Sequence, residues 1–151
     1  TAGSMDKHLK PFDLVVSTKA AYHDVDEEIL TDFHPWMKSC YFQADEKLLA
    51  MARKVAEKYM QNTPVFGTMV TGEAFIEENE EMIEKYEALS VDMETASIAH
   101  VCYVNEIPFL AVRAITDCAD EEAKDNFEEN CKKASEKSAE FVRMLLKEWK
   151  E

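Results

Sequence analysis

Short apolar runs of strand length alternate with segments of helical period along most of this 151-residue chain. A strand followed by a helix, repeated several times, is typical of an α/β fold in which helices cover both faces of a sheet. The sequence therefore predicts a three-layer α/β/α sandwich with a mostly parallel mixed sheet. The strands are expected at 13–17, 65–72, 88–93 and 108–116, and the helices at 44–62, 77–86, 95–103 and 127–150.

The hydrophobic content of 46% is enough for one core, so residues 1–151 are expected to form a single domain. The segment from residue 44 places apolar side chains at helical spacing and predicts an amphipathic helix. Residues 95–103 are almost wholly apolar or small, which predicts a buried helix. The last helix is expected to carry one apolar stripe, made of Ala134, Ser138, Phe141, Leu145 and Trp149.

The net charge of −14 argues against nucleic acid and against anionic membranes as partners. A small molecule or another protein is the expected partner. The four cysteines have no paired spacing and are expected to be reduced thiols, and the four histidines show no metal-ligand spacing. Neither a metal nor a cofactor is predicted. No apolar run reaches the length of a membrane span, so a cytoplasmic location is expected.

Three carboxylates, Asp92, Glu94 and Asp117, lie at the ends of some of the most apolar segments. Charged groups beside a core are costly unless they are paired, hydrogen-bonded or protonated. Because ligands of parallel sheets bind where strands end, two of these acids, Glu94 and Asp117, are expected to converge on one edge with Phe75 and Met93. Each also has a structural explanation: Glu94 or Asp117 could cap the backbone that follows, and Arg113 could be the buried partner of Asp92.

Four segments together resemble a known enzyme family. They are "TAGSMDKHLKPFDLVVS…YHDVD", "TGEAF", "VDMETASIAHVCY" and "IPFLAVRAITDCADEEAKDNFEE". This order of motifs is similar to that of the 5′-methylthioadenosine/S-adenosylhomocysteine nucleosidases of the purine nucleoside phosphorylase superfamily. The resemblance implies a phosphorylase/hydrolase-like fold and hydrolysis of the bond between adenine and ribose, in methionine salvage. It also implies that "TAGSM" is native sequence and that N-terminal strands, with the glutamate that activates water, are absent.

The resemblance implies two catalytic residues. Asp117 would be the general acid that protonates adenine, because a neutral base leaves more readily than an anion. This role requires a carboxyl group that holds a proton near neutral pH, which a sparsely solvated pocket favours. Glu94 would accept hydrogen bonds from the ribose hydroxyls.

The remaining positions implied by the resemblance bind substrate. Met93 would pack on the ribose, Phe75 would stack on adenine, and the backbone of Ile76 would contact the purine edge. The other implied binding residues are Thr1, Gly3, Thr116 and Phe127.

Some features leave alternatives open. Residues 30–40 depart from the family pattern, so the preference among methylthioadenosine, S-adenosylhomocysteine and related nucleosides is undetermined. The cluster of Phe33, Pro35, Trp36 and Met37 could serve a homodimer interface or pack on its own domain. A purine or uridine phosphorylase is a second reading, although no arginine lies in a strand-end loop to hold phosphate. A non-catalytic fragment that binds adenine nucleosides is a third.

Overall fold

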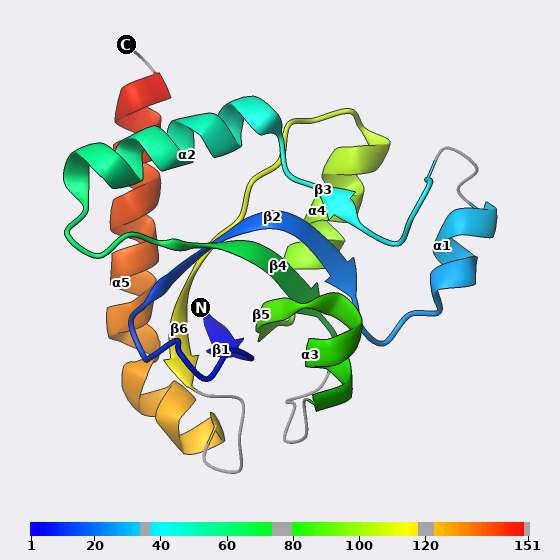
Figure 1. Ribbon diagram of the computed structural model, residues 1–151, viewed down its shortest axis with the longest axis horizontal. Coiled ribbons are helices and arrows are strands. Elements are labelled where there is room, and N and C mark those ends of the chain that lie inside the picture. The colour runs from blue at the N-terminus through cyan, green and yellow to red at the C-terminus, as the bar shows by residue number, and fades with distance from the viewer. Residues whose placement is uncertain (34–36, 74–79, 118–122, 150–151) are drawn as a thin grey trace.

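The computed structural model describes residues 1–33, 37–73, 80–117 and 123–149 (Figure 1). Six strands and five helices lie within these ranges. In chain order they are β1 (Ala2–Ser4), β2 (Leu14–Tyr22), α1 (Glu27–Phe33), β3 (Phe42–Gln43), α2 (Glu46–Tyr59), β4 (Val65–Thr71), α3 (Glu80–Tyr86), β5 (Ala88–Asp92), α4 (Thr95–Val104), β6 (Val112–Asp117) and α5 (Ala123–Trp149).

The strands form one sheet in the order β3-β2-β4-β5-β1-β6, and β2 also pairs with β6. Five strands therefore close into a ring, with β3 attached outside it. Among the described strands the β2–β4, β4–β5 and β1–β6 pairs are parallel, whereas the β1–β5, β2–β3 and β2–β6 pairs are antiparallel. The mixed α/β class is confirmed. The three-layer arrangement is not confirmed, because the strands close into a ring and do not form an open sheet. The prediction of mostly parallel pairing is not confirmed either, because parallel pairs are not in the majority.

Apolar side chains pack both inside and outside the ring. Val15, Met69 and Ile115 are fully buried and form an inner cluster with Leu9. Neighbouring residues of the same strands, such as Leu14 and Val16, pack in a separate cluster with residues of α2 and α5. The continuous apolar runs of β2 and β6 follow from this two-sided burial.

The helices lie on two sides of the strands (Figure 1). α2 and α5 cross on one side, whereas α4 and the short α1 and α3 lie on the other. The hydrophobic core on the side of α4 includes Ala21, Phe42, Val70, Tyr86 and Ala96.

The amphipathic helix predicted from residue 44 is confirmed as α2. Asp45 caps it by accepting hydrogen bonds from the backbone N–H groups of Lys47 and Leu48, at 3.0 and 2.9 Å. The stripe of α5 buries Ala134, Phe141 and Leu145. The last residue of the predicted stripe, Trp149, is not buried, since it is 62% exposed.

The prediction that residues 95–103 form a buried helix is wrong. α4 buries one face through Thr95, Ala96 and Ala99, and leaves Ile98 and Val101 51% and 61% exposed. Composition alone could not separate the two faces because both are apolar.

Three elements were not expected from the sequence. They are α1, the two-residue strand β3 and the three-residue strand β1. β1 is too short to show an alternating pattern, and it is a strand only because β5 and β6 flank it.

Within the described ranges, the helices are either too short or too polar to cross a lipid bilayer. The three cysteines in these ranges, Cys40, Cys102 and Cys131, are free thiols, in agreement with the predicted reduced state.

Candidate functional site

Asp92, the last residue of β5, is the centre of a buried polar network. Its carboxylate accepts hydrogen bonds from the hydroxyl of Thr71 on β4 at 2.7 Å and from the N–H groups of Glu94 and Thr95 at 3.1 and 2.9 Å. The hydroxyl of Thr95 also donates to it. The side chain of Asp92 is 1% exposed. Asp92, rather than Glu94, therefore caps α4, and Glu94 makes no side-chain cap hydrogen bond.

Arg113 of β6 joins this network to Glu94. Its Nε lies 3.1 Å from Asp92 Oδ2, as the sequence predicted, and donates to the Thr95 hydroxyl at 3.0 Å. Its Nη2 lies 3.3 Å from Glu94 Oε2. The side chain of Glu94 is 59% exposed, so one oxygen is held by the guanidinium while the group faces solvent. We call Thr71, Asp92, Glu94, Thr95 and Arg113 the Asp92 network.

Asp117, the last residue of β6, is buried with 4% exposure. The hydroxyl of Thr116 lies 2.6 Å from Asp117 Oδ2 and 3.2 Å from the carbonyl oxygen of Ala2. The side chain of Asn130 on α5 donates to the carbonyl of Thr116 at 2.9 Å. The end of β6 is therefore fixed both by its neighbouring strand and by the last helix.

The short strand β1 lies between the two groups of acids. Gly3 pairs with Val91 of β5 on one side and with Asp117 on the other. At its start, the carbonyl of Thr1 lies 3.5 Å from Arg113 Nη1. The predicted residues Thr1 and Gly3 thus connect the Asp92 network to the end of β6.

The expectation that Glu94 and Asp117 meet because parallel strands end together is wrong for Asp117. β6 runs parallel to β1, and β1 is antiparallel to β5, so β6 does not end on the same edge as β5 by that rule. Asp117 and Val91 instead flank Gly3 on opposite sides, so the end of β6 lies one strand away from β5. The physical reason is the antiparallel pairing of β1 with β5, which the sequence did not predict.

Of the other predicted binding residues, some lie within the described residues and some outside them. Met93 is 41% exposed next to Glu94, and Thr116 is fully buried, whereas Phe127 is half-buried near the start of α5. Phe75 and Ile76 lie outside the described residues.

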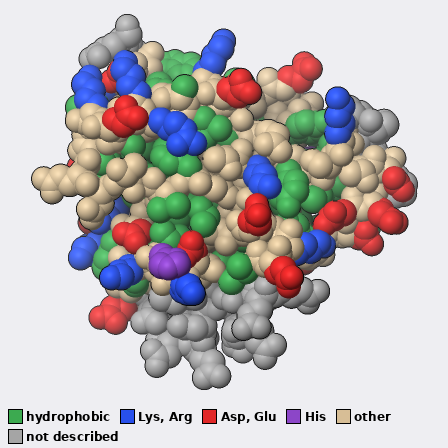
Figure 2. Space-filling model, in the orientation of Figure 1, with side chains coloured by type: hydrophobic (Ala, Val, Ile, Leu, Met, Phe, Trp, Pro, Cys, Tyr) green, Lys and Arg blue, Asp and Glu red, His purple; other side chains and the backbone are tan. Residues whose placement is uncertain are grey.

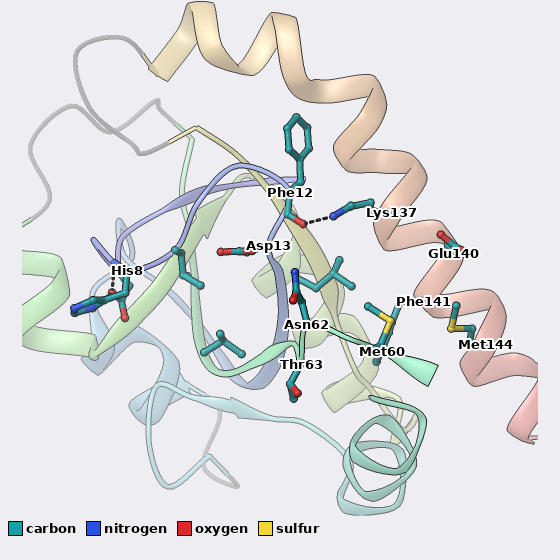
Figure 3. Close-up of a pocket in the computed structure, with 14 residues that line it drawn as sticks. His8, Phe12, Asp13, Met60, Asn62, Thr63, Lys137, Glu140, Phe141 and Met144 are labelled. Atoms are coloured by element: carbon teal, nitrogen blue, oxygen red, sulfur yellow. Dashed lines mark hydrogen bonds and ion pairs between the residues drawn. The ribbon is translucent and has the colours of Figure 1, made fainter. Parts of the chain in front are cut away.

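A cavity of about 370 Å³ lies elsewhere, at the end of the ring where β2 and β4 begin (Figure 3). Its walls are both polar and apolar. Asp13, Asn62, Lys137, Phe141 and Met144 are among the residues that line it. Among the described residues, none of those predicted to act on a substrate lines this cavity, so it is not the candidate site.

Sequence reasoning missed two contributors to the geometry. Thr71 was not singled out, although its hydroxyl also accepts from the N–H of Ala96 at 2.9 Å and so joins β4 to α4. The contact of Arg113 with Glu94 was missed as well, because only Asp92 was considered as its partner. Both contributors could have been found from their position, because a buried hydroxyl or cation close to an acid requires a hydrogen-bond or ion-pair partner.

The chain is similar to known proteins over nearly its whole length. A family model described as the phosphorylase superfamily matches residues 1–147. A 5′-methylthioadenosine/S-adenosylhomocysteine nucleosidase of Actinobacillus succinogenes is 38% identical over 154 residues, which cover 98% of this chain and 66% of that relative.

Two solved structures from Helicobacter pylori are similar to this chain. An aspartate-to-asparagine variant of a 5′-methylthioadenosine/S-adenosylhomocysteine nucleosidase, with 5′-methylthioadenosine in its active site, is 32% identical with a TM-score of 0.86, covering 98% of this chain and 66% of that one. A futalosine hydrolase is 33% identical with a TM-score of 0.87, covering 98% and 65%. The chain thus spans about 66% of the length of the curated relative it matches.

Proposed function

The chain belongs to the phosphorylase superfamily, and on that premise we propose that it carries the nucleoside site of an enzyme that hydrolyses the N-glycosidic bond of 5′-methylthioadenosine and S-adenosylhomocysteine. The reaction releases adenine from the sugar. The predicted setting is methionine salvage in the cytoplasm.

The burial of Asp117 is the observation that carries this proposal. The carboxyl group is almost fully removed from solvent and is fixed by the Thr116 hydroxyl at the end of β6. Departure of adenine needs a proton at its five-membered ring, and a positioned acid contributes roughly 10²–10⁴-fold to such a step. Asp117 is the proton donor in our proposal.

Glu94 is the residue that we assign to the sugar. Arg113 contacts one of its oxygens, and the exposed remainder of the carboxylate is available to accept hydrogen bonds from ribose hydroxyls. The negative charge also favours the positive charge that develops on the sugar as the bond breaks. Met93, exposed beside it, supplies an apolar surface for the ribose.

The base is assigned to Phe75 and the backbone of Ile76, with Phe127 closing over the site and Thr1, Gly3 and Thr116 lining it. These roles stay predictions that rest on the family resemblance. The half-buried position of Phe127 near the start of α5 is compatible with its role.

Hydrolysis is favoured over phosphorolysis by the partners of the arginines. Arg113 is paired with Asp92 and Glu94, and the guanidinium of Arg53 lies 4.2 Å from the ring centroid of Phe66. Neither is available as a fixed cation for phosphate. Among related nucleosides, futalosine is a second candidate substrate, because a relative of similar identity is named for its hydrolysis.

We also propose that the protein forms a homodimer through the exposed face of α4. Ile98, Val101 and Val104 are at least half exposed there, and α4 contains no charged residue. Two copies that each carry a charge of −14 repel one another least where a surface is neutral. Met37, part of the cluster first considered for an interface, is instead 6% exposed within the core.

Light scattering during size-exclusion chromatography tests this surface. Val101→Glu should convert a dimer into a monomer, because it places a charge on the neutral face, while Val142→Glu on α5, also at an exposed valine, should leave the mass unchanged. A wild-type chain that is monomeric at all concentrations contradicts the proposal.

Adenine release from 5′-methylthioadenosine, measured with and without phosphate, tests the reaction. The assay compares this chain with one lengthened to the full span of its relatives. Release without phosphate supports hydrolysis, and Asp117→Asn should then lower turnover by at least roughly a hundredfold while binding persists. Release only with phosphate indicates a phosphorylase, and adenine binding without release indicates a non-catalytic fragment.

A further inference from the structure

Two residues that follow β2 contact the end of β4 and the backbone directly after it. The N–H of His23 donates to the carbonyl of Thr71 at 3.0 Å, which extends the pairing of the two strands. One residue later, Asp24 Oδ2 accepts from the N–H of Glu73 at 2.9 Å, although the two residues are 49 positions apart. The turn after β2 therefore holds Thr71 and Glu73, on either side of Gly72.

The ring of His23 lies directly against Gly72. A Cβ atom added to Gly72 would lie 2.1 Å from His23 Nε2 and 2.2 Å from Cε1, far inside van der Waals contact. Gly72 does not have a positive φ. Glycine is therefore required here because the imidazole occupies the space of a side chain, and not because of the backbone conformation.

The imidazole is not retained for a hydrogen bond. Nε2 of His23 is buried and has no hydrogen-bond partner. An unpaired buried polar atom is unfavourable, so a histidine is a poor choice if its only function is to fill space. Its flat ring packed on Gly72 is the feature that remains to explain its presence.

The same backbone is held from the opposite side by β5. The N–H of Gly72 donates to the carbonyl of Asp92 at 3.1 Å, and the hydroxyl of Thr71 donates to the Asp92 carboxylate. Residues 71–73 are thus fixed between the turn after β2 and the Asp92 network. That network in turn holds Glu94 through Arg113.

We propose that His23 and Asp24 are positioning residues for the base of the bound nucleoside. They fix the backbone at Gly72 and Glu73, from which the chain continues to Phe75 and Ile76. The inference rests on the proposed function, in which Phe75 and Ile76 bind adenine. It assigns a role in base binding to the turn after β2, whereas none of the residues assigned to the substrate above lies on β2 or in that turn.

The contacts specify which substitutions should matter. Asp24→Ala removes the acceptor for the Glu73 N–H, whereas Asp24→Asn retains an oxygen that can accept it. Gly72→Ala forces the His23 ring away, and adding His23→Ala creates the space that the new methyl group needs. Asp26→Ala is the matched control, because Asp26 accepts a backbone N–H at 2.9 Å from Glu28, in the same loop but away from residues 71–73.

Isothermal titration calorimetry of the chain with adenine, and separately with 5′-methylthioadenosine, measures the effect. We expect Asp24→Ala and Gly72→Ala to weaken both ligands on the order of tenfold. Asp24→Asn, Asp26→Ala and the Gly72→Ala/His23→Ala double variant should bind within roughly threefold of wild type. In a chain that turns over substrate, the same variants should raise KM more than they lower kcat.

The outcomes separate this inference from the proposed function. If wild type binds adenine and both Asp24→Ala and Gly72→Ala bind it equally well, the positioning role is wrong and the proposed function stands. If Asp26→Ala weakens binding as much as Asp24→Ala, the effect is one of loop stability and the inference is again contradicted. If wild type binds neither ligand, the proposed function fails, and this inference fails with it.

Discussion

The two ends of the strand ring hold their acidic side chains in different ways. Where β5 ends, Asp92 is buried and bound by Thr71 and Arg113, each 21 positions away in sequence. Where β2 and β4 begin, Asp6 and Asp13 accept hydrogen bonds from the backbone N–H groups of His8 and Lys10, two and three positions away. The first arrangement requires the whole fold to form, whereas the second requires only a local turn.

This difference supports the site that we propose at the end of β5. The end with local contacts has the 370 Å³ cavity, yet Asp6 and His8 beside it are partly or largely exposed. On the face shown in Figure 2, charged side chains of both signs are mixed. The end with long-range contacts keeps charged groups beside the core, which is costly unless they are paired and is most often found where a site needs them.

The largest effect is expected from Asp92→Ala. The substitution leaves Arg113 without its buried partner and removes the acceptor for four hydrogen bonds from Thr71, Glu94 and Thr95. Breaking a buried ion pair in this way costs roughly 3–5 kcal/mol of unfolding free energy. Urea denaturation followed by circular dichroism measures it.

A cost for Asp92→Ala no larger than that of an exposed acid would show that the two ends do not differ. Asp45→Ala is a useful control because Asp45 also caps a helix but is not paired with a cation. Its expected cost is about 1 kcal/mol, the usual contribution of an N-cap. The excess of Asp92→Ala over Asp45→Ala therefore measures the ion pair and the link to β4.

A smaller effect is expected from Thr71→Val, which preserves shape and removes one hydroxyl. That hydroxyl is buried, donates to Asp92 and accepts from the N–H of Ala96. Leaving the N–H of Ala96 unsatisfied should cost about 1–3 kcal/mol. Denaturation of Thr71→Ser, which keeps the hydroxyl, is the control, and equal losses in both variants would assign the effect to packing instead.

The pairing of α2 with α5 supplies a prediction outside both ends of the ring. Glu148 of α5 contacts the ammonium groups of Lys54 and Lys58 on α2. The hydrogen bond from Lys54, followed by its charge, lowers the pKa of Glu148 below its ordinary value. A carboxylate with a lowered folded pKa stabilises the fold above its unfolded pKa, and that contribution is lost as the pH falls through the folded pKa.

Glu148→Gln should therefore be slightly less stable than wild type near neutral pH and equally stable in acid. Thermal unfolding at a series of pH values measures the difference. Glu140→Gln, on the same helix and without an ion pair among the described residues, should show no such convergence. A difference that persists unchanged in acid would mean that the charge of Glu148 does not act through the lysines.

The sequence predicted the parts of this fold that depend on neighbours in the chain. The period of residues 44–59 identified α2, and a lone arginine inside an apolar run correctly indicated that Arg113 has a buried acidic partner. Asp117 and Glu94 became candidates because each lies at the end of an apolar run, and their roles stay predictions. Each of these inferences needs only local spacing and the cost of a buried charge.

Features set by distant pairing could not be predicted in the same way. Closure of the ring depends on β2 pairing with β6, almost 100 residues later, and no local pattern encodes that register. β1 is a strand only because β5 and β6 are beside it. The exposure of Ile98 and Val101 on α4 was missed because the sequence pattern of an apolar helix is the same whether the helix faces a core or a partner.

The smallest effect is expected from Asp6→Ala, at the end of the ring with local contacts. Asp6 accepts from the N–H of His8 at 2.8 Å and contacts its ring at 2.9 Å, but the side chain of His8 is 80% exposed. Exposed pairs of this kind contribute roughly 0–1 kcal/mol, so unfolding in urea should change little, and less still in high salt. If Asp6→Ala instead destabilised the chain as much as Asp92→Ala, local contacts at the first end would be as important to the fold as the long-range network at the second. The distinction drawn between the two ends would then have to rest on chemistry alone, with Glu94 and its contact with Arg113 as its support.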